Sequence, residues 1–191
     1  MNAYDFDETI YDGDSTRDFY FYCLRRFPKV AKFLPMQGAK ALSWKVLKKI
    51  DKTTFKENFY RFFTAVPDID AAVADFWDGH FQNIKSWYLA QKKADDLIIS
   101  ASPEFLLRPA CDRLGLCNLI ASRVDKKTGA YTGENCWGKE KVHRLYEEIP
   151  YAVIDDFYSD SLSDTPMAML AERDRFIVRG DVLIPWDEYR K

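Results

Sequence analysis

The sequence is poor in the residues that build zinc sites and disulfide frameworks, and it lacks a long apolar run. Its four cysteines have no CxxC spacing, so they are expected to be reduced thiols and not zinc ligands; they are Cys23, Cys111, Cys117 and Cys136. The two histidines, His80 and His143, are too few and too far apart in the chain to suggest a catalytic or zinc-binding pair. No apolar run approaches the roughly 18 to 20 residues of a membrane span.

An excess of positive charge is also absent. The chain has 28 lysines and arginines against 30 aspartates and glutamates, which gives a net charge of -2. This balance gives no reason to expect a nucleic acid or an anionic membrane as a partner. The N-terminus lacks the basic segment followed by an apolar segment that marks a signal peptide, so we expect a cytoplasmic protein.

The sequence is rich in apolar and aromatic side chains. The chain has 191 residues, of which 47% are hydrophobic and 16% are aromatic, and its length suits one sizeable domain, or one domain with a modest insertion. Between about residues 16 and 93 the aromatic residues recur at helical spacing, so this segment is predicted to be all-helical. The helices predicted there cover residues 14–26, 37–50, a stretch with Phe55, Phe59, Phe62 and Phe63 on one face, and 73–88.

Outside this segment, short apolar runs alternate with helical patterns. Ser102 and Pro103 are expected to cap and open the helix that follows the second strand, and Gly115 to end it. The alternation predicts an α/β fold, with a Rossmann-like parallel sheet core and an inserted all-helical cap. Residues 1–15 and 94–191 would form the core, and residues 16–93 would form the cap.

Acidic and hydroxyl side chains follow the predicted strands. They would therefore meet at the carboxyl edge of the sheet, where open α/β proteins form their sites. A lysine at the start of the helix near residue 140 would join them. The set is Asp5, Asp7, Ser100, Lys139 or Lys141, Asp160 and Asp164.

This set has the parts that phosphoryl transfer needs. Carboxylates from separate strands form an oxygen site for Mg²⁺, and the cation keeps neighbouring acids ionised. One aspartate can then attack phosphorus, while an acid two residues later protonates the leaving alcohol and activates water. A serine hydroxyl and the free N–H groups of a helix start bind phosphate oxygens, and a lysine neutralises their charge.

Four motifs, taken in order, resemble the haloacid dehalogenase-like hydrolase superfamily, and in particular its phosphoserine-phosphatase-like branch. They are "DFDET" from Asp5, "SAS" from Ser100, Lys141 followed four residues later by Leu145, and the acidic pair Asp160 and Asp164. The helical insertion directly after the first motif also resembles the helical cap of that branch. The implied activity is a Mg²⁺-dependent phosphatase that hydrolyses a small phosphate monoester through an aspartyl-phosphate.

The resemblance implies a role for each matching residue. Asp5 would be the nucleophile, and Asp7 would be the general acid and base. Mg²⁺ would be bound by the Asp5 carboxylate, the Asp7 main-chain carbonyl and Asp160. The phosphate-binding residues would be Ser100, Ala101 and Lys141, and the supporting residues would be Thr9 and Asp164.

The substrate stays open at this point. Phosphoserine enzymes of the family carry a glutamate where Asp14 stands, so this shorter acid is a candidate for substrate choice between phosphoserine and another monoester. Two alternative functions are a receiver-like phosphoacceptor and a non-catalytic module that binds a phosphorylated metabolite.

The last motif can be read in two registers. Asp156 and Asp160 are separated by three residues, as are Asp160 and Asp164. The later pair is preferred, because small residues surround Asp160 and a helix is predicted to start near Thr165.

Overall fold

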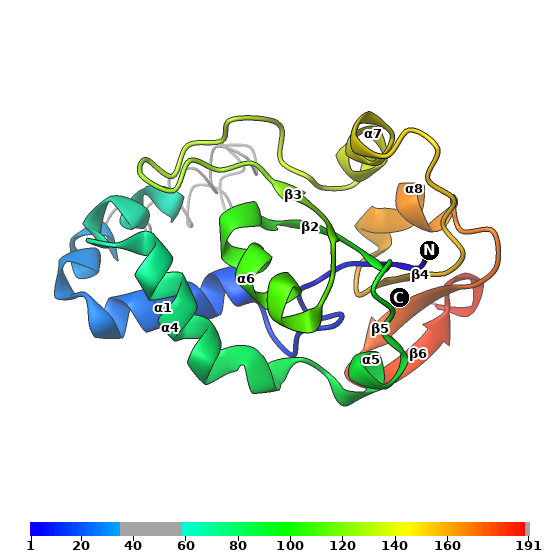
Figure 1. Cartoon of the computed structure of the whole chain (residues 1–191), viewed down its shortest axis with the longest axis horizontal. Helices are drawn as coiled ribbons and strands as arrows, with labels where there is room; N and C mark the ends of the chain where they lie inside the picture. The colour runs from blue at the N-terminus through cyan, green and yellow to red at the C-terminus, as the bar shows by residue number, and fades with distance from the viewer. Residues whose placement is uncertain (35–58, 190–191) are drawn as a thin grey trace.

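The computed structural model describes residues 1–34 and 59–189, and a six-stranded sheet forms its core (Figure 1). The strand order is β3-β2-β1-β4-β5-β6, and every neighbouring pair is parallel except β5 and β6. The strands are β1 (Ala3–Tyr4), β2 (Leu97–Pro103), β3 (Asn118–Ser122), β4 (Phe157–Ser159), β5 (Arg175–Arg179) and β6 (Val182–Pro185). The predicted α/β fold with a mostly parallel sheet is confirmed, whereas the antiparallel edge strand β6 was not foreseen.

Helices cover both faces of the sheet, because successive residues of a strand point to opposite sides. Tyr4 and Ile98 belong to a buried cluster that also contains residues of α6 (Glu104–Leu114). Ala3 and Leu97 belong to a second cluster, with residues of α7 (Lys139–Glu148) and α8 (Thr165–Ala168). A central strand buried on both faces explains why β2 reads as a continuous apolar run.

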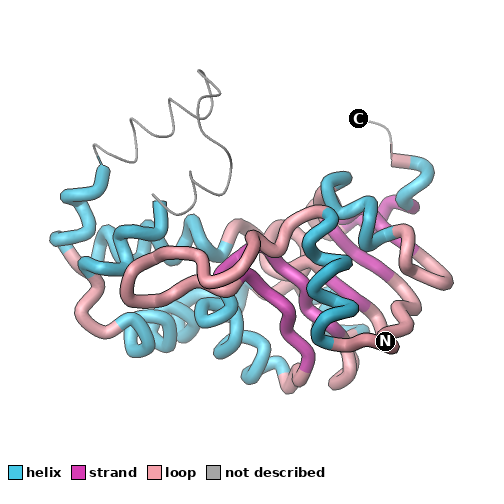
Figure 2. Tube along the Cα trace, turned by 90° about the horizontal axis from the view of Figure 1, so that it is seen from above, coloured by secondary structure: helices cyan, strands magenta, loops and turns pink. Residues whose placement is uncertain are grey.

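Every element that the structure describes between β1 and β2 is helical. In both views α1 and α4 lie beyond one end of the sheet (Figures 1 and 2). The elements are α1 (Ser15–Arg26), η1 (Pro28–Phe33), η2 (Arg61–Ala65), α4 (Ile69–His80), η3 (Phe81–Asn83) and α5 (Ser86–Gln91). The division into core and cap remains a prediction, and the predicted helix at 37–50, like Phe55, lies outside the described residues.

Side-chain caps and one glycine set several helix ends. The Asp14 carboxylate accepts a hydrogen bond from the main-chain N–H of Arg17 and begins α1, and Asp68 caps α4 in the same way. Gly115 ends α6 as predicted, with a left-handed φ of 72°. The last helical pattern, near residue 165, yields only the short α8.

The predicted continuous helix over residues 73–88 is wrong. The chain leaves helical geometry between α4 and α5, because Ile84 pairs with Tyr11 and the N–H of Lys85 donates to the carbonyl of Ile10. The buried Lys85 ammonium also donates to the carbonyls of Glu8, at 2.9 Å, and Gly180, at 2.8 Å. Tertiary hydrogen bonds to the loop after β1 therefore override the local aromatic spacing.

The predicted Ser102 cap of α6 is also wrong. Strand β2 continues to Pro103, and α6 begins at Glu104 without a side-chain cap. The Ser102 hydroxyl donates instead to the Asp7 carboxylate. Within residues 1–34 and 59–189, no helix combines the length and apolar character needed to cross a bilayer.

The loop between β3 and α7 reaches the helical segment next to η2. Gly129 has a φ of 77°, and a Cβ placed there would lie 2.5 Å from the main-chain carbon and oxygen of Tyr60. Lys126 of the same loop forms an ion pair with Asp70 of α4. The backbone at Gly129 therefore packs directly against the backbone of Tyr60, and this contact fixes the position of Tyr60.

Gly129→Ala is expected to lower the free energy of unfolding by about 2 to 4 kcal/mol, because left-handed strain adds to the collision with Tyr60. Gly115→Ala is the matched control: its φ of 72° is similar, but no atom lies within 4 Å of the added Cβ. It should cost only about 1 to 2 kcal/mol. Urea unfolding measures both losses, and equal losses would contradict the close approach.

Candidate active site

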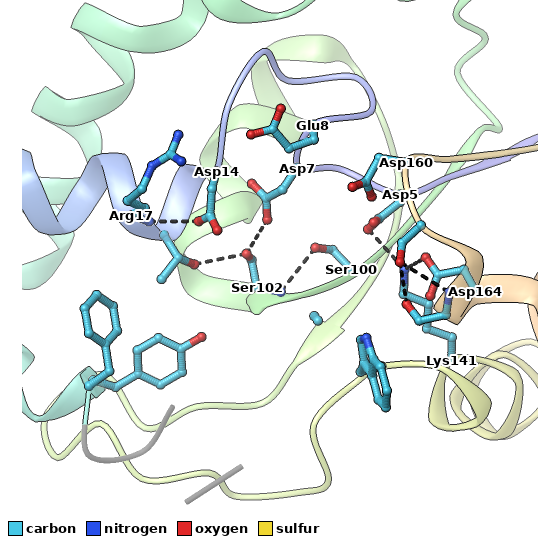
Figure 3. A pocket seen from close by; sticks show the side chains of 17 residues that line it. Asp5, Asp7, Glu8, Asp14, Arg17, Ser100, Ser102, Lys141, Asp160 and Asp164 are labelled. Carbon is cyan, nitrogen blue, oxygen red and sulfur yellow. Dashed lines mark hydrogen bonds and ion pairs between the residues drawn. The ribbon is translucent and has the colours of Figure 1, made fainter. Parts of the chain in front are cut away.

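A cavity of about 420 Å³ opens at the carboxyl edge of the sheet (Figure 3). The predicted site residues that line it are Asp5, Asp7, Asp14, Ser100, Ala101, Lys141, Asp160 and Asp164. They come together because β1 pairs with β2 on one side and with β4 on the other. The residues near or just after the carboxyl ends of these three strands therefore meet at a point where the strand order reverses.

Lys141 joins two acids of the cavity. Its ammonium lies 3.1 Å from Asp5 Oδ1 and 2.6 Å from Asp164 Oδ2. The Lys141 side chain is only 1% exposed, whereas Lys139 is exposed to solvent. Burial lowers the pKa of Lys141, but the charges of Asp164 and Asp5 more than offset that effect and raise it, so the ammonium stays charged. Of the two candidate lysines, only Lys141 lines the cavity.

Asp5 is held through one of its two carboxylate oxygens. Oδ1 accepts hydrogen bonds from the N–H of Phe6, at 2.9 Å, and faces Lys141. Among the described residues, no hydrogen bond or ion pair ends on Oδ2. Burial raises the pKa of Asp5 to about 7, against the lowering effect of Lys141, and the charges of Asp164 and Asp160 raise it further. Asp5 therefore lines the cavity with Oδ1 bound to the protein and Oδ2 without a hydrogen-bond partner among the described residues.

Asp7 is bound on both oxygens. Oδ1 accepts from the N–H of Ser15, at 2.7 Å, in the first turn of α1, and Oδ2 accepts from the hydroxyl of Ser102, at 2.5 Å. Burial and the charge of Asp14 raise the pKa of Asp7 to about 6, although both hydrogen bonds lower it. A carboxyl with such a pKa can both give and take a proton near neutrality.

Thr9 and Ser159 shape the loop that carries Asp160 and Asp164. The main-chain N–H of Asp160 donates to Thr9 Oγ1 at 2.9 Å, and the Ser159 hydroxyl donates to Asp164 Oδ2 at 2.8 Å. Thr9 is fully buried and does not line the cavity. Burial raises the pKa of Asp160, and the nearby charge of Asp164 acts in the same direction.

Asp156, the first acid of the alternative register, and its neighbour Asp155 lie outside the cavity. Asp156 binds Arg173 at 3.0 Å, and Asp155 accepts from the N-terminal ammonium at 3.0 Å, which lowers the pKa of Asp155. Neither acid lines the cavity, whereas Asp160 and Asp164 both do. The structure thus explains the two adjacent acids before β4 as ion-pair partners at the outer end of the sheet.

The donors present fit a Mg²⁺ ion. Asp5, Asp160 and Asp164 bring three acids together against the single charge of Lys141, and burial disfavours their ionised forms. A divalent cation would correct this imbalance, and Mg²⁺ takes one or two carboxylates together with water and phosphate oxygens. In residues 1–34 and 59–189, no three or more His, Cys, Asp or Glu side chains are grouped so that they alone could hold a metal ion.

Several residues of the cavity were not singled out from the sequence as site residues. Thr16 and Arg17 come from the first turn of α1, Tyr60 precedes η2, and Trp137 and Ser163 flank α7 and α8. The sequence carries no motif for them, since each sits at an ordinary helical or loop position. Only the packing of separate segments brings them to the cavity.

The fold and this arrangement of acids, lysine and serine define the chain as a Rossmann-like α/β protein with a polar site at its strand switch point. A family model described as haloacid dehalogenase-like hydrolase matches residues 3–169. The chain belongs to the haloacid dehalogenase-like hydrolase family. The resemblance inferred from the four motifs is thereby confirmed.

The chain resembles one curated protein in sequence and several solved structures in fold. Protein CicA of Caulobacter vibrioides is 34% identical over 96 residues, which are 47% of this chain and 43% of that protein, so less than half of the relative is matched. A protein of unknown function from Bordetella pertussis Tohama I has a TM-score of 0.68 at 19% identity, over 87% of this chain and 84% of that one.

Two further solved structures carry names related to phosphoserine. A probable phosphoserine phosphatase from Vibrio cholerae has a TM-score of 0.61 at 12% identity, over 89% of this chain and 54% of that one. A phosphoserine phosphohydrolase-like protein from Francisella tularensis has a TM-score of 0.56 at 13% identity, over 95% and 89%. At these identities the likeness concerns the fold.

Lys141→Met is expected to lower the free energy of unfolding by about 3 to 5 kcal/mol at pH 8 without added metal, because it leaves buried acids without their counter-charge. Lys139→Met, two residues away on the exposed side of α7, should change it by no more than about 0.5 kcal/mol. Urea unfolding of the two variants gives the comparison. A small loss in Lys141→Met would contradict the ion-pair geometry.

Proposed function

We propose that this protein is a Mg²⁺-dependent phosphatase that hydrolyses a small phosphate monoester through an aspartyl-phosphate on Asp5. One observation carries the proposal: Asp5 lines the same cavity as Ser100, Lys141 and Asp160, and its Oδ2 accepts no hydrogen bond from any described residue. Membership of a hydrolase family and the fold shared with phosphoserine phosphatases support it.

In the first step, an Asp5 oxygen attacks phosphorus, and the bond between phosphorus and the alcohol oxygen breaks. Asp7 gives its proton to the departing oxygen, so the alcohol leaves neutral. Ser100 and the main chain at Ala101 would bind phosphate oxygens, and Lys141 would offset their charge.

In the second step, water attacks the phosphorus of the aspartyl-phosphate. Asp7, now ionised, takes a proton from this water, and the bond between phosphorus and Asp5 breaks to release inorganic phosphate. Asp5 and Asp7 return to their starting protonation states, so the cycle balances.

Mg²⁺ bound by the carboxylates of Asp5 and Asp160 and the carbonyl of Asp7 would supply positive charge that keeps Asp5 ionised and offsets phosphate charge. Asp164 has a different duty, because it fixes the Lys141 ammonium. Thr9 supports the loop of Asp160 from behind the cavity.

Asp14 has two properties that bear on substrate choice. It lines the cavity, and its Oδ1 caps α1 through the N–H of Arg17. The proposed substrate is a small phosphorylated metabolite whose organic part lies on this side of the cavity. The match to a hydrolase family argues against a role as a receiver-like phosphoacceptor. The next experiment tests the other alternative, a module that binds a phosphorylated metabolite without hydrolysing it.

Asp5→Asn should lower Mg²⁺-dependent hydrolysis of p-nitrophenyl phosphate by at least about 1,000-fold, because an amide oxygen is a poor nucleophile. Removal of Mg²⁺ by a chelator should abolish wild-type activity, and added Mg²⁺ should restore it. Asp156→Asn, an equal change outside the cavity, should stay within about twofold of wild type. Hydrolysis by Asp5→Asn at the wild-type rate would refute the nucleophile, and a wild-type protein without activity on any stable monoester would favour a binding module.

Asp7→Asn should slow turnover by about 100-fold or more and cause a phosphoenzyme to accumulate. The reason is that p-nitrophenolate leaves without help from an acid, whereas hydrolysis of the aspartyl-phosphate needs a base. Acid-quenched protein, measured by intact mass, should carry one phosphoryl group in this variant and none in the double variant with Asp5→Asn. Normal turnover without accumulation would remove Asp7 from the mechanism.

A further inference from the structure

The main chain of Asp160, a proposed metal ligand, is bound on both sides. Its N–H donates to the hydroxyl of Thr9, in the loop after β1, at 2.9 Å. Its carbonyl accepts a hydrogen bond from Nη1 of Arg179, the last residue of β5. These two contacts fix the peptide groups on either side of the Asp160 Cα. The Asp160 carboxylate can therefore turn only about its own side-chain bonds.

Arg179 lies outside the cavity, and it is itself held in place. The residue is exposed to solvent, where an arginine ordinarily samples many rotamers. Its Nη2 and Nε donate to the hydroxyl of Tyr189 at 2.7 and 3.2 Å, and its Nη1 also donates to the carbonyl of Val178 at 3.1 Å. Because the guanidinium is planar and rigid, these contacts also orient the N–H that reaches Asp160.

The turn that follows Arg179 is fixed to the other side of the site. The buried ammonium of Lys85 donates to the carbonyl of Gly180, at 2.8 Å, and to that of Glu8, at 2.9 Å. Glu8 follows Asp7, whose carbonyl is a predicted metal ligand. The turn between β5 and β6 therefore contacts both loops that carry predicted ligands, through Arg179 on one side and through Gly180 on the other.

We propose that Arg179, oriented by Tyr189, is a positioning residue for Asp160 and that its hydrogen bond to the Asp160 carbonyl raises the affinity of the site for a divalent cation. This inference rests on the proposed function, because it concerns the same cation site. Arg179 touches neither substrate nor cation and acts through the main chain of Asp160. Groups that hold a metal ligand from behind commonly control metal affinity in this way.

The charge of Arg179 and its contact with Asp160 predict opposite effects on metal binding. Arg179 lies close enough to Asp160 to act on its carboxyl and lower its pKa, although burial and Asp164 raise that pKa. A positive charge so near the site repels a cation, so on charge alone its removal would strengthen metal binding. Loss of the positioning contact would weaken it. The sign of the change therefore separates the two effects.

Arg175 offers a matched control. It is the first residue of the same strand, and its Nη2 donates to the carboxylate of Asp187 at 2.8 Å. Both arginines thus anchor β5 to the segment after β6. Of the two, only Arg179 donates a hydrogen bond to Asp160 in the part of the chain that the structure describes.

Binding of Mn²⁺ alone tests the proposal without turnover, because Mn²⁺ takes the same oxygen ligands as Mg²⁺ and its free form is measured by electron paramagnetic resonance. Arg179→Met should weaken Mn²⁺ binding by about tenfold, and Tyr189→Phe by about threefold. Arg175→Met should stay within about twofold of wild type. Unchanged or tighter binding in Arg179→Met would overturn the proposal, as would equal losses in Arg179→Met and Arg175→Met.

Kinetics on p-nitrophenyl phosphate gives a second measurement, which separates metal affinity from a general loss of active protein. In Arg179→Met, the Mg²⁺ concentration that gives half the maximal rate should rise by about tenfold, whereas kcat at saturating Mg²⁺ should fall by less than about threefold. A lower kcat at an unchanged Mg²⁺ requirement would contradict the positioning role.

The two measurements also separate this inference from the proposed function. Weaker Mn²⁺ binding in Arg179→Met alone of the two arginine variants would uphold the role of Arg179 even if the wild-type protein hydrolysed no monoester. Unchanged Mn²⁺ binding in that variant would overturn the role even if the phosphatase activity were established. A wild-type protein that binds no Mn²⁺ would overturn both.

Discussion

The buried contact of Lys141 with Asp5 and Asp164 is the interaction on which the site depends. It joins the end of β1, the first turn of α7 and the loop after β4, three segments distant in the chain. Because charges so fully buried are tolerated only when paired, the ammonium determines where both acids lie. It also leaves surplus negative charge at Asp160, which is the physical reason to expect a cation there.

A second constraint links the proposed acid and base to the helical segment. Asp7 is bound by the N–H of Ser15 in α1 and by Ser102 at the end of β2, and Ser102 in turn contacts the hydroxyl of Thr16. The carboxyl of Asp7 therefore sits between core and helices. The pKa of Asp7 therefore depends on how α1 and the end of β2 are placed relative to each other.

The candidate site could be predicted largely because its residues lie near or just after the carboxyl ends of parallel strands, and parallel strands place these ends together. Asp5, Ser100 and Asp160 were foreseen on this basis. Two choices could not be made locally: Lys139 and Lys141 are equally plausible by residue type, and two acidic pairs have the same spacing. Burial on one face of α7 and pairing with Asp164 favour Lys141 and the later acids as cavity residues.

By itself, the sequence determined the alternation of strands and helices, the helical segment after β1 and the order of the acidic motifs, since these depend on periodicity and on spacing. The tertiary structure alone decided that Ser102 binds Asp7 in place of capping α6 and that Lys85 breaks a predicted helix. The reason is physical. Each of these depends on hydrogen bonds between segments that are far apart in the chain. The local residue pattern does not show which distant segments come together.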